Sequence, residues 1–324
     1  MGLLVDGVWS DDSHDAKRFQ GGRFVRPATR YRNWVTPNGS PGPSGEGGFP
    51  AARGRYHLYV ALSCPWAHRT VIYRKLKALE DVISMSVVEP VPVNDGWEFA
   101  PGADTVNGKS KLYEIYQLAD PRFTGRVTVP VLWDKERRTI VNNESAEIIR
   151  MLNSAFDAFT AAKTDYYSND LRAEIDAINT LVYENVNNGV YRSGFATAQE
   201  AYEEACRGVF SALDRIEEQL SRQRYVTGAR LTEADLRLFP TLIRFDAVYY
   251  SHFKCNLRRI GDYANLSNYV RDLYQTRGIG ETVNMDHIKR HYYGSQRRVN
   301  PTGIVPLGPE LDFTAPHDRG RFGK

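Results

Sequence analysis

The residues with the clearest chemical potential lie at positions 62–69, which read LSCPWAHR and include Cys64. The apolar, β-prone residues 56–61 before them predict a strand, and residues 66–79 carry apolar side chains at helical spacing. Cys64 therefore falls on the first helical turn, where Pro65 is tolerated because a first-turn residue needs no amide hydrogen. The amides and dipole of a helix start favour the thiolate, which is the nucleophilic form of cysteine.

This chemistry depends on a single thiol, because Ala67 stands where a dithiol motif would place its second cysteine. A lone thiolate can attack a sulfur atom, hold it as a mixed disulfide and wait for an external thiol to release it. Two other interpretations stay open at this point. Cys64 could be a buried structural cysteine, or it could pair with His68 on a metal ion, although that spacing supplies only two ligands.

The composition is that of a globular protein. The 324 residues allow two domains, and the net charge of +3 is too small to indicate nucleic acid or a membrane surface as a partner. Three cysteines, odd in number and widely spaced, favour a reducing compartment over a disulfide scaffold. We see no apolar run of membrane-spanning length and no signal-peptide core near the first residues, so we expect a cytoplasmic enzyme.

The chain divides by composition into four segments. We expect an N-terminal extension at 1–50, an α/β unit at 51–160, a helical region at 161–293 and an irregular tail at 294–324. The extension is basic and rich in glycine and proline, which favours a solvated arm that wraps the body. The alternative is that it lends a wall or positive charge to a pocket for an anion.

The α/β unit has the order of a thioredoxin-like fold, a small mixed sheet flanked by helices. The predicted strands cover residues 56–61, 83–88, 127–133 and 139–141, and the predicted helices cover 66–79 and 145–153. A long polar insertion occupies 89–125. Pro130 interrupts the third strand and suggests a cis bond that frees the backbone of Val129 to pair with a bound peptide. Glu144 and Ser145 open the last helix, where amides can hold a carboxylate. We expect a pocket for a small peptide acid whose thiol lies against Cys64.

Apolar residues at three-to-four spacing predict helices in the following region, over 168–187, 197–221, 232–252, 262–277 and 284–293. Thr232 and Asp235 have the spacing of a capping box. Tyr191 follows Gly189 in a predicted loop between two helices. Cys206 and Cys255 are expected to be unreactive.

A thioredoxin-like unit followed by an all-helical domain is the glutathione-transferase architecture. More specifically, the chain resembles the glutathionyl-hydroquinone reductases, or Xi class, over nearly its whole length. The motifs that carry the resemblance are SCPWAHR (63–69), RVTVPVLW (126–133), NESAEIIR (143–150), NGVY (188–191), LTEADLRL (231–238), HFKC (252–255) and NPTGI (300–304).

The resemblance implies an enzyme that removes glutathione from glutathionyl-hydroquinones through a Cys64–glutathione mixed disulfide, releasing hydroquinone and glutathione disulfide. It makes Cys64 the nucleophile and Tyr191 the proton donor to the ring carbon. It places Tyr249 and Tyr292 near the thiol, where they would assist its ionisation. Glutathione contacts are implied at Trp97, Arg126, Val127, Thr128, Val129, Glu144 and Ser145. Glutathione is the co-substrate, no metal is expected, and the chain is expected to form a homodimer.

Some choices remain open from the sequence. Tyr250 and Tyr293 are neighbours of Tyr249 and Tyr292 and compete with them for the same roles. An omega-like thiol transferase or dehydroascorbate reductase would share the fold and Cys64. A non-catalytic binding protein on this fold would need no reactive thiol.

Overall fold

The computed structural model describes residues 2–10, 19–91 and 96–323. They divide into two compact units. The first comprises Met1–Asp15, Ala28–Thr164 and Thr282–His291, and the second comprises Ala16–Pro27, Asp165–Glu281 and Tyr292–Lys324. Within the described ranges, no helix is both long enough and apolar enough to cross a membrane.

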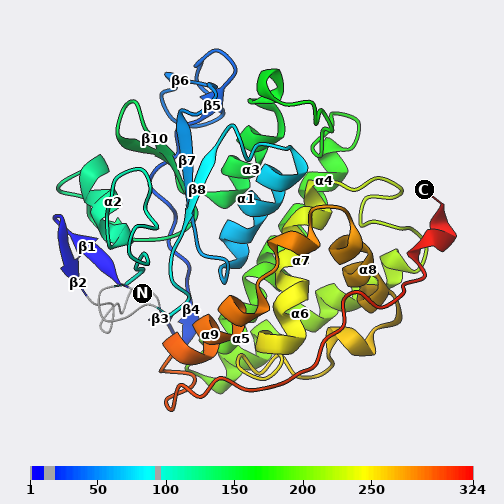
Figure 1. Cartoon of the computed structure of the whole chain (residues 1–324). Helices are drawn as coiled ribbons and strands as arrows, with labels where there is room; N and C mark the ends of the chain where they lie inside the picture. Colours follow the sequence, from blue (N-terminus) through cyan, green and yellow to red (C-terminus); the bar gives the residue numbers. More distant parts are fainter. Residues whose placement is uncertain (1, 11–18, 92–95, 324) are drawn as a thin grey trace. The chain divides into compact units, whose positions relative to one another are not determined.

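A four-stranded mixed sheet forms the centre of the first unit (Figure 1), in the order β11-β10-β7-β8. Its strands are β7 (Tyr56–Val60), β8 (Ser84–Val87), β10 (Val131–Asp134) and β11 (Thr139–Asn142). β7 pairs parallel with β8 and antiparallel with β10, and every residue of β7 is buried. Helix α1 (Pro65–Leu76) packs against β7 and against α3 (Ser145–Ser154). The predicted thioredoxin-like order of elements is therefore confirmed.

The predicted strand at 127–133 is wrong at its start. The structure has a two-residue strand β9 (Gly125–Arg126), and the central strand β10 begins only at Val131. Pro130 explains the delay, because it has no amide hydrogen to give to a sheet. The Val129–Pro130 peptide bond is cis, as the sequence suggested.

In its described residues, the N-terminal extension is more structured than the solvated arm that we expected, although most of these residues are exposed or half-buried. It contains the strands β1 (Leu3–Val5), β2 (Val8–Ser10), β5 (Val35–Thr36) and β6 (Phe49–Pro50). β1 pairs antiparallel with β9, which lies more than a hundred residues later. Leu4, Val35 and Phe49 are buried. The predicted polar insertion likewise holds a helix, α2 (Leu112–Ala119), which packs against β11.

The second unit is helical, apart from the hairpin β3 (Phe19–Gln20) and β4 (Arg23–Phe24). Its helices are α4 (Arg172–Val182), α5 (Gly189–Gly194), α6 (Gln199–Leu220), α7 (Glu233–Arg244) and α8 (Ala264–Gln275). Helix α9 (Met285–Ser295) is divided between the two units after His291. Two π-helical segments, Tyr183–Asn187 and Phe245–Tyr249, extend α4 and α7. Short 3-10 helices occur at Asp157–Phe159, Ile260–Asp262, Gly280–Thr282 and Arg319–Phe322.

The predicted capping box at the start of α7 is present. Asp235 is fully buried and accepts the amide of Thr232 at 2.9 Å, the amide of Val226 at 2.9 Å and the hydroxyl of Tyr269 at 2.7 Å. Burial raises the pKa of Asp235, and these hydrogen bonds oppose the rise. One carboxylate thereby ties the helix start to the preceding loop and to α8.

Candidate active site

Cys64 is half-buried and is the N-cap residue of α1, one residue before the predicted first turn. Its amide donates to the carbonyl of Ala61 at 3.0 Å, and its carbonyl accepts the amide of His68 at 2.9 Å. The thiol Sγ lies 3.8 Å from the carbonyl oxygen of Val129. The strand-to-helix turn therefore fixes the thiol between a helix start and the loop that precedes β10.

The sequence left open a metal site formed by Cys64 and His68. His68 is buried, and its Nε2 lies 2.8 Å from the Thr282 hydroxyl. No group of three or more His, Cys, Asp or Glu side chains in the described residues is arranged around a common point. All three cysteines are thiols, and burial raises the pKa of Cys206 and takes that of Cys255 to about 12.

One buried hydroxyl organises the backbone next to the thiol. Tyr116 of α2 donates to the carbonyl of Thr128 at 2.9 Å and accepts the Thr128 amide at 3.2 Å. The side-chain amide of Asn143 donates to the same hydroxyl at 3.1 Å. Tyr116 thus connects the loop 126–129 to the turn that opens α3, which are two of the predicted glutathione-contact segments. Sequence reasoning assigned this tyrosine no role.

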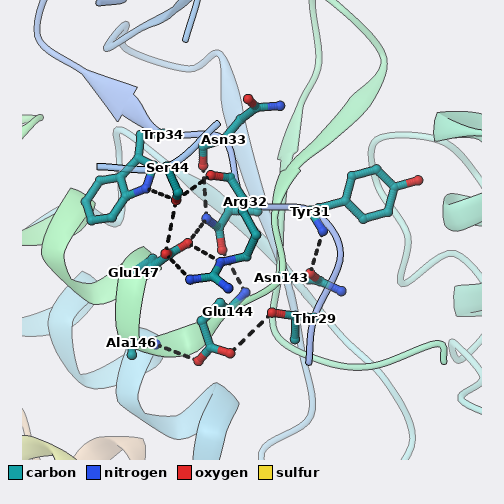
Figure 2. Close-up of polar contacts among 11 residues, drawn as sticks. Thr29, Tyr31, Arg32, Asn33, Trp34, Ser44, Asn143, Glu144, Ala146 and Glu147 are labelled. Carbon is teal, nitrogen blue, oxygen red and sulfur yellow. Dashed lines mark hydrogen bonds and ion pairs between the residues drawn. The ribbon is translucent and has the colours of Figure 1, made fainter. Parts of the chain in front are cut away.

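The start of α3 is held by its own first carboxylate (Figure 2). Glu144 is the N-cap residue, and its side chain accepts the amide of Ala146 at 3.2 Å and the hydroxyl of Thr29 at 3.3 Å. Ser145 is buried, and its hydroxyl lies 3.5 Å from a guanidinium nitrogen of Arg69 in α1. Glu144 and Ser145 therefore sit at a helix start, as predicted, with the Glu144 carboxylate facing residues of the extension.

A second carboxylate one turn later fastens the extension to α3 (Figure 2). Glu147 accepts the side-chain amide of Asn142 at 2.7 Å, Arg32 Nε at 2.8 Å and the Ser44 hydroxyl at 3.1 Å. Asn143 adds a contact by accepting the amide of Tyr31 at 3.2 Å. The extension thus acts as a brace for the turn that carries Glu144.

Trp97 lies in the insertion and is only 3% exposed. Its ring stacks on His291, with centroids 4.9 Å apart, and its Nε1 has no hydrogen-bond partner among the described residues. The loop around it is ordered by Asp104, which accepts the Tyr59 hydroxyl and the amides of Val106, Asn107 and Lys109 at 2.9–3.2 Å. Among the other predicted contacts, Val127 and Val129 are buried, whereas Arg126 and Thr128 are half-buried.

The second unit brings the three predicted tyrosines together. The Tyr191 hydroxyl lies 2.5 Å from that of Tyr292, which lies 2.8 Å from that of Tyr249. Tyr293 is not part of this group, because its hydroxyl bonds the Ala247 carbonyl at 3.1 Å. We call Tyr191, Tyr249 and Tyr292 the phenol cluster.

Local irregularities of the helices place the phenols. Tyr191 lies on the short helix α5 rather than in the predicted loop. Gly194 at its end permits a close approach, since a Cβ there would lie 2.2 Å from the ring of Phe253. Phe253 in turn packs against Tyr191 and stacks on Tyr249, at centroid distances of 5.4 and 5.5 Å. Tyr249 ends a π-helical segment, a feature that is frequent at functional sites.

The cluster is deeply desolvated. Tyr249 and Tyr292 are fully buried, and burial raises the pKa of each well above its ordinary value. The buried cation of Arg244 acts in the opposite direction on both. Tyr249 and Tyr292 therefore stay protonated near neutral pH and can donate hydrogen bonds.

A cysteine at a helix start beside a cis-proline loop, in a chain with a helical second unit, defines the glutathione-transferase class of proteins. Two family models match this chain, "Glutathione S-transferase, N-terminal domain" over residues 63–155 and "Glutathione S-transferase, C-terminal domain" over residues 199–272.

The similarity to individual proteins is closer. Glutathionyl-hydroquinone reductase YqjG of Escherichia coli is 56% identical to this chain, and the match covers both chains completely. Glutathionyl-hydroquinone reductase PcpF of Sphingobium chlorophenolicum is 55% identical, over 95% of this chain and 96% of its own. A glutathione-bound structure of the E. coli protein matches with a TM-score of 0.90 at 54% identity, over 98% of this chain and 99% of the other. The chain belongs to the glutathionyl-hydroquinone reductase family.

Proposed function

We propose that this protein is an enzyme that removes glutathione from glutathionyl-hydroquinones, using Cys64 as its nucleophile and a second glutathione as reductant. The observation that carries the proposal is the Cys64 thiol at the N-cap of α1, 3.8 Å from the Val129 carbonyl. The names of the relatives at 56% and 55% identity support the same activity.

The reaction is written in two half-reactions. An aromatic thioether resists attack at sulfur because the departing carbon would be a carbanion. If the hydroquinone first tautomerises to a ketone, with a proton added to the carbon that bears sulfur, that carbon can leave as a stabilised enolate. The Cys64 thiolate then forms the new sulfur–sulfur bond as the carbon–sulfur bond breaks, and the ring regains aromaticity as hydroquinone.

The second half-reaction restores the enzyme. A glutathione thiolate attacks the glutathione sulfur of the mixed disulfide, which releases glutathione disulfide and the Cys64 thiolate. Such a covalent intermediate predicts ping-pong kinetics. The helix start at Cys64 favours the thiolate in both steps, as attacking group and as leaving group.

In this proposal Tyr191 relays the proton to the ring carbon, and Tyr249 and Tyr292 assist by hydrogen bonding. The hydroxyl contacts of the phenol cluster support this division of roles. The proposal requires Tyr191 to reach the ring of the substrate whose sulfur Cys64 attacks.

Glutathione is proposed to bind to the thioredoxin-like part, residues 51–160, and the ring to the helical part, residues 161–293. The backbone of Val129 would pair with the peptide, and the Nε1 of Trp97 is a buried donor that a ligand could satisfy. The remaining proposed contacts are Arg126, Val127, Thr128, Glu144 and Ser145. Glu144 would meet the amino group of the γ-glutamyl part.

The thiol chemistry also bears on the cell compartment and the assembly. A thiolate enzyme that consumes glutathione needs a reducing compartment, so we propose a cytoplasmic location. We also propose a homodimer, and light scattering of the purified protein at micromolar concentration tests it. A monomer mass would overturn that part of the proposal alone.

The function is tested by mixing the protein with glutathionyl-menadiol and analysing protein and products by mass spectrometry. We expect one glutathione on Cys64 and free menadiol in a single turnover without added glutathione. Cys64→Ala abolishes both, whereas the matched Cys206→Ala, at a buried thiol of α6, retains them. Undiminished menadiol release by the Cys64→Ala protein would refute the proposal.

Tyr191→Phe separates this activity from simple thiol transfer. We expect it to slow ring release by about 10²- to 10⁴-fold, the range for general acid–base catalysis, with little effect on turnover of a small disulfide. Tyr293→Phe is the control, because its hydroxyl lies outside the phenol cluster. Equal losses in both reactions would favour an omega-like transferase, and an inert thiol would favour a binding protein.

A further inference from the structure

The N-terminal extension places a cation on the face of one phenol. Arg26 lies with its guanidinium carbon 4.9 Å from the centroid of the Tyr191 ring. Its Nε donates to the side-chain oxygen of Asn188 at 2.7 Å, which fixes the direction of the guanidinium. Arg26, Asn188 and Tyr191 all belong to the second unit.

The segment that carries Arg26 is anchored to the helices of the same unit. The carbonyl of Gly22, at the tip of the β3–β4 hairpin, accepts the amide of Thr197 at 3.0 Å. Phe24 is buried against Phe195, with ring centroids 5.2 Å apart. Arg26 follows Phe24 by two residues. The packing of Phe24 therefore fixes its backbone, and the hydrogen bond to Asn188 fixes its guanidinium over the Tyr191 ring.

A cation over an aromatic face interacts with the electron-rich ring, and the attraction grows when the ring becomes a phenolate. The Tyr191 ring is only 7% exposed, whereas Arg26 is exposed, so water screens the cation on its outer side but not on the side that faces the ring. We propose that Arg26 is a positioning residue that promotes proton donation by Tyr191 during release of the hydroquinone ring. This inference rests on the function proposed above and adds a residue for which neither the motifs nor the resemblance provides a role.

The surroundings of Arg26 make the idea testable by substitution. Arg26 lines a cavity of about 310 Å³ together with Tyr183, Glu184 and Arg192. A shorter or uncharged side chain therefore leaves no gap in a packed core. The charged or titratable groups around the phenol cluster include the buried Arg244 and His252, whose ring lies 6.4 Å from that of Tyr292, and neither changes in the test.

The test compares Arg26→Met, which removes the charge at similar length, with Arg26→Lys, which keeps it. For Arg26→Met we expect kcat for ring release to fall about 2- to 5-fold, the fold-change that corresponds to a cation–π contact at an exposed site, with KM within about twofold. Turnover of a small disulfide such as hydroxyethyl disulfide is unchanged, because it needs no proton on carbon. Arg26→Lys recovers most of kcat, and Arg23→Met, at an exposed ion pair with Glu204, serves as the control.

Three results would overturn the inference. Equal losses in ring release and disulfide turnover would mean a structural role for Arg26. A rise in KM with kcat unchanged would mean substrate binding. An additive effect of Arg26→Met in a Tyr191→Phe protein would mean that Arg26 does not act through Tyr191.

The same experiments distinguish this inference from the function on which it rests. If Tyr191→Phe impairs ring release but Arg26→Met does not, only the inference fails. If Tyr191→Phe leaves ring release intact, the proton role of Tyr191 fails, and the role of Arg26 fails with it.

Discussion

The hydroxyl of Tyr116 is the contact whose removal tests the architecture of the glutathione side most directly. Tyr116→Phe deletes one oxygen from a fully buried ring and leaves its apolar packing in place. It also leaves the Thr128 carbonyl, the Thr128 amide and the Asn143 side-chain amide without their partner. Each buried polar group left unpaired costs about 1–3 kcal/mol, and partial relaxation reduces the sum, so we expect a loss of about 2–4 kcal/mol.

A neighbouring tyrosine provides the matched control. The ring of Tyr31 lies 6.0 Å from that of Tyr116, and its buried hydroxyl has no hydrogen-bond partner among the described residues. Burial raises the pKa of both tyrosines, so both hydroxyls are protonated at neutral pH. Tyr31→Phe therefore removes an equivalent oxygen without breaking a bond, and we expect it to be neutral or slightly stabilising.

Urea unfolding of the three proteins in one buffer measures the difference. With a slope near 3 kcal/mol per M, a 2–4 kcal/mol loss lowers the midpoint of Tyr116→Phe by roughly 1 M, while Tyr31→Phe stays at the wild-type value. Because Thr128 belongs to the proposed glutathione contacts, KM for glutathione should rise several-fold in Tyr116→Phe alone. Equal midpoints for the two variants would refute the reasoning.

Two further predictions concern stability. Burial lowers the pKa of His57 to about 4. Below about pH 6.5, His57 therefore binds a proton in the unfolded chain but not in the folded chain. The free energy of unfolding should fall by up to about 3 kcal/mol on acidification to pH 4. His57→Gln should remove that part of the loss, and a urea-midpoint drop between pH 7 and 4.5 as large as in the wild type would contradict this. Arg319 is fully buried, and it donates to the carbonyl of Leu220 at the end of α6 and to those of Gln223 and Arg224 just after it. Arg319→Met should destabilise the protein by about 2–3 kcal/mol in urea unfolding, because it leaves these carbonyls without their donor. Arg321→Met, at an exposed ion pair with Asp318, should cost under about 0.5 kcal/mol. Similar midpoints for the two variants would argue against a stabilising role of the Arg319 hydrogen bonds.

The position of Cys64 was predictable because every signal for it is local. A β-prone run, a proline and an apolar helical pattern lie within some twenty residues, and together they place the thiol at a helix start. The structure moves it by one residue, from the first turn to the N-cap. The family motifs then indicated which distant residues to examine.

Helix α2 and the role of its Tyr116 hydroxyl were missed for different reasons. Leu112, Ile115 and Tyr116 are buried at the spacing of one helix face, so the signal for a short helix was present among the surrounding polar and glycine residues. The partners of the Tyr116 hydroxyl lie 12 and 27 positions away. A pattern that reports periodicity cannot report which hydroxyl will meet which carbonyl.

The short strands of the extension were missed for a related reason. Its strands are two or three residues long, and β1 pairs with residues 125–126. Glycine-rich, basic sequence favours a solvated arm on local grounds, and only the tertiary partners, such as Glu147 for Arg32, convert it into a brace. The alternative, that the extension lends a wall or positive charge to a pocket for an anion, stays a prediction.

Under the proposed mechanism, the three members of the phenol cluster differ in how well they could exchange a proton with the substrate. Tyr249 and Tyr292 are fully buried, and their raised pKa values keep them protonated, so they serve as donors to a neighbour. Tyr191 is 7% exposed and has a cation on its ring face, which makes it the member best able to carry negative charge briefly. The Tyr292 hydroxyl, 2.5 Å away, can donate to the Tyr191 oxygen and accept from Tyr249. In the proposed reaction, hydrogen bonds from Tyr249 to Tyr292 and from Tyr292 to Tyr191 would compensate for the proton that Tyr191 gives up.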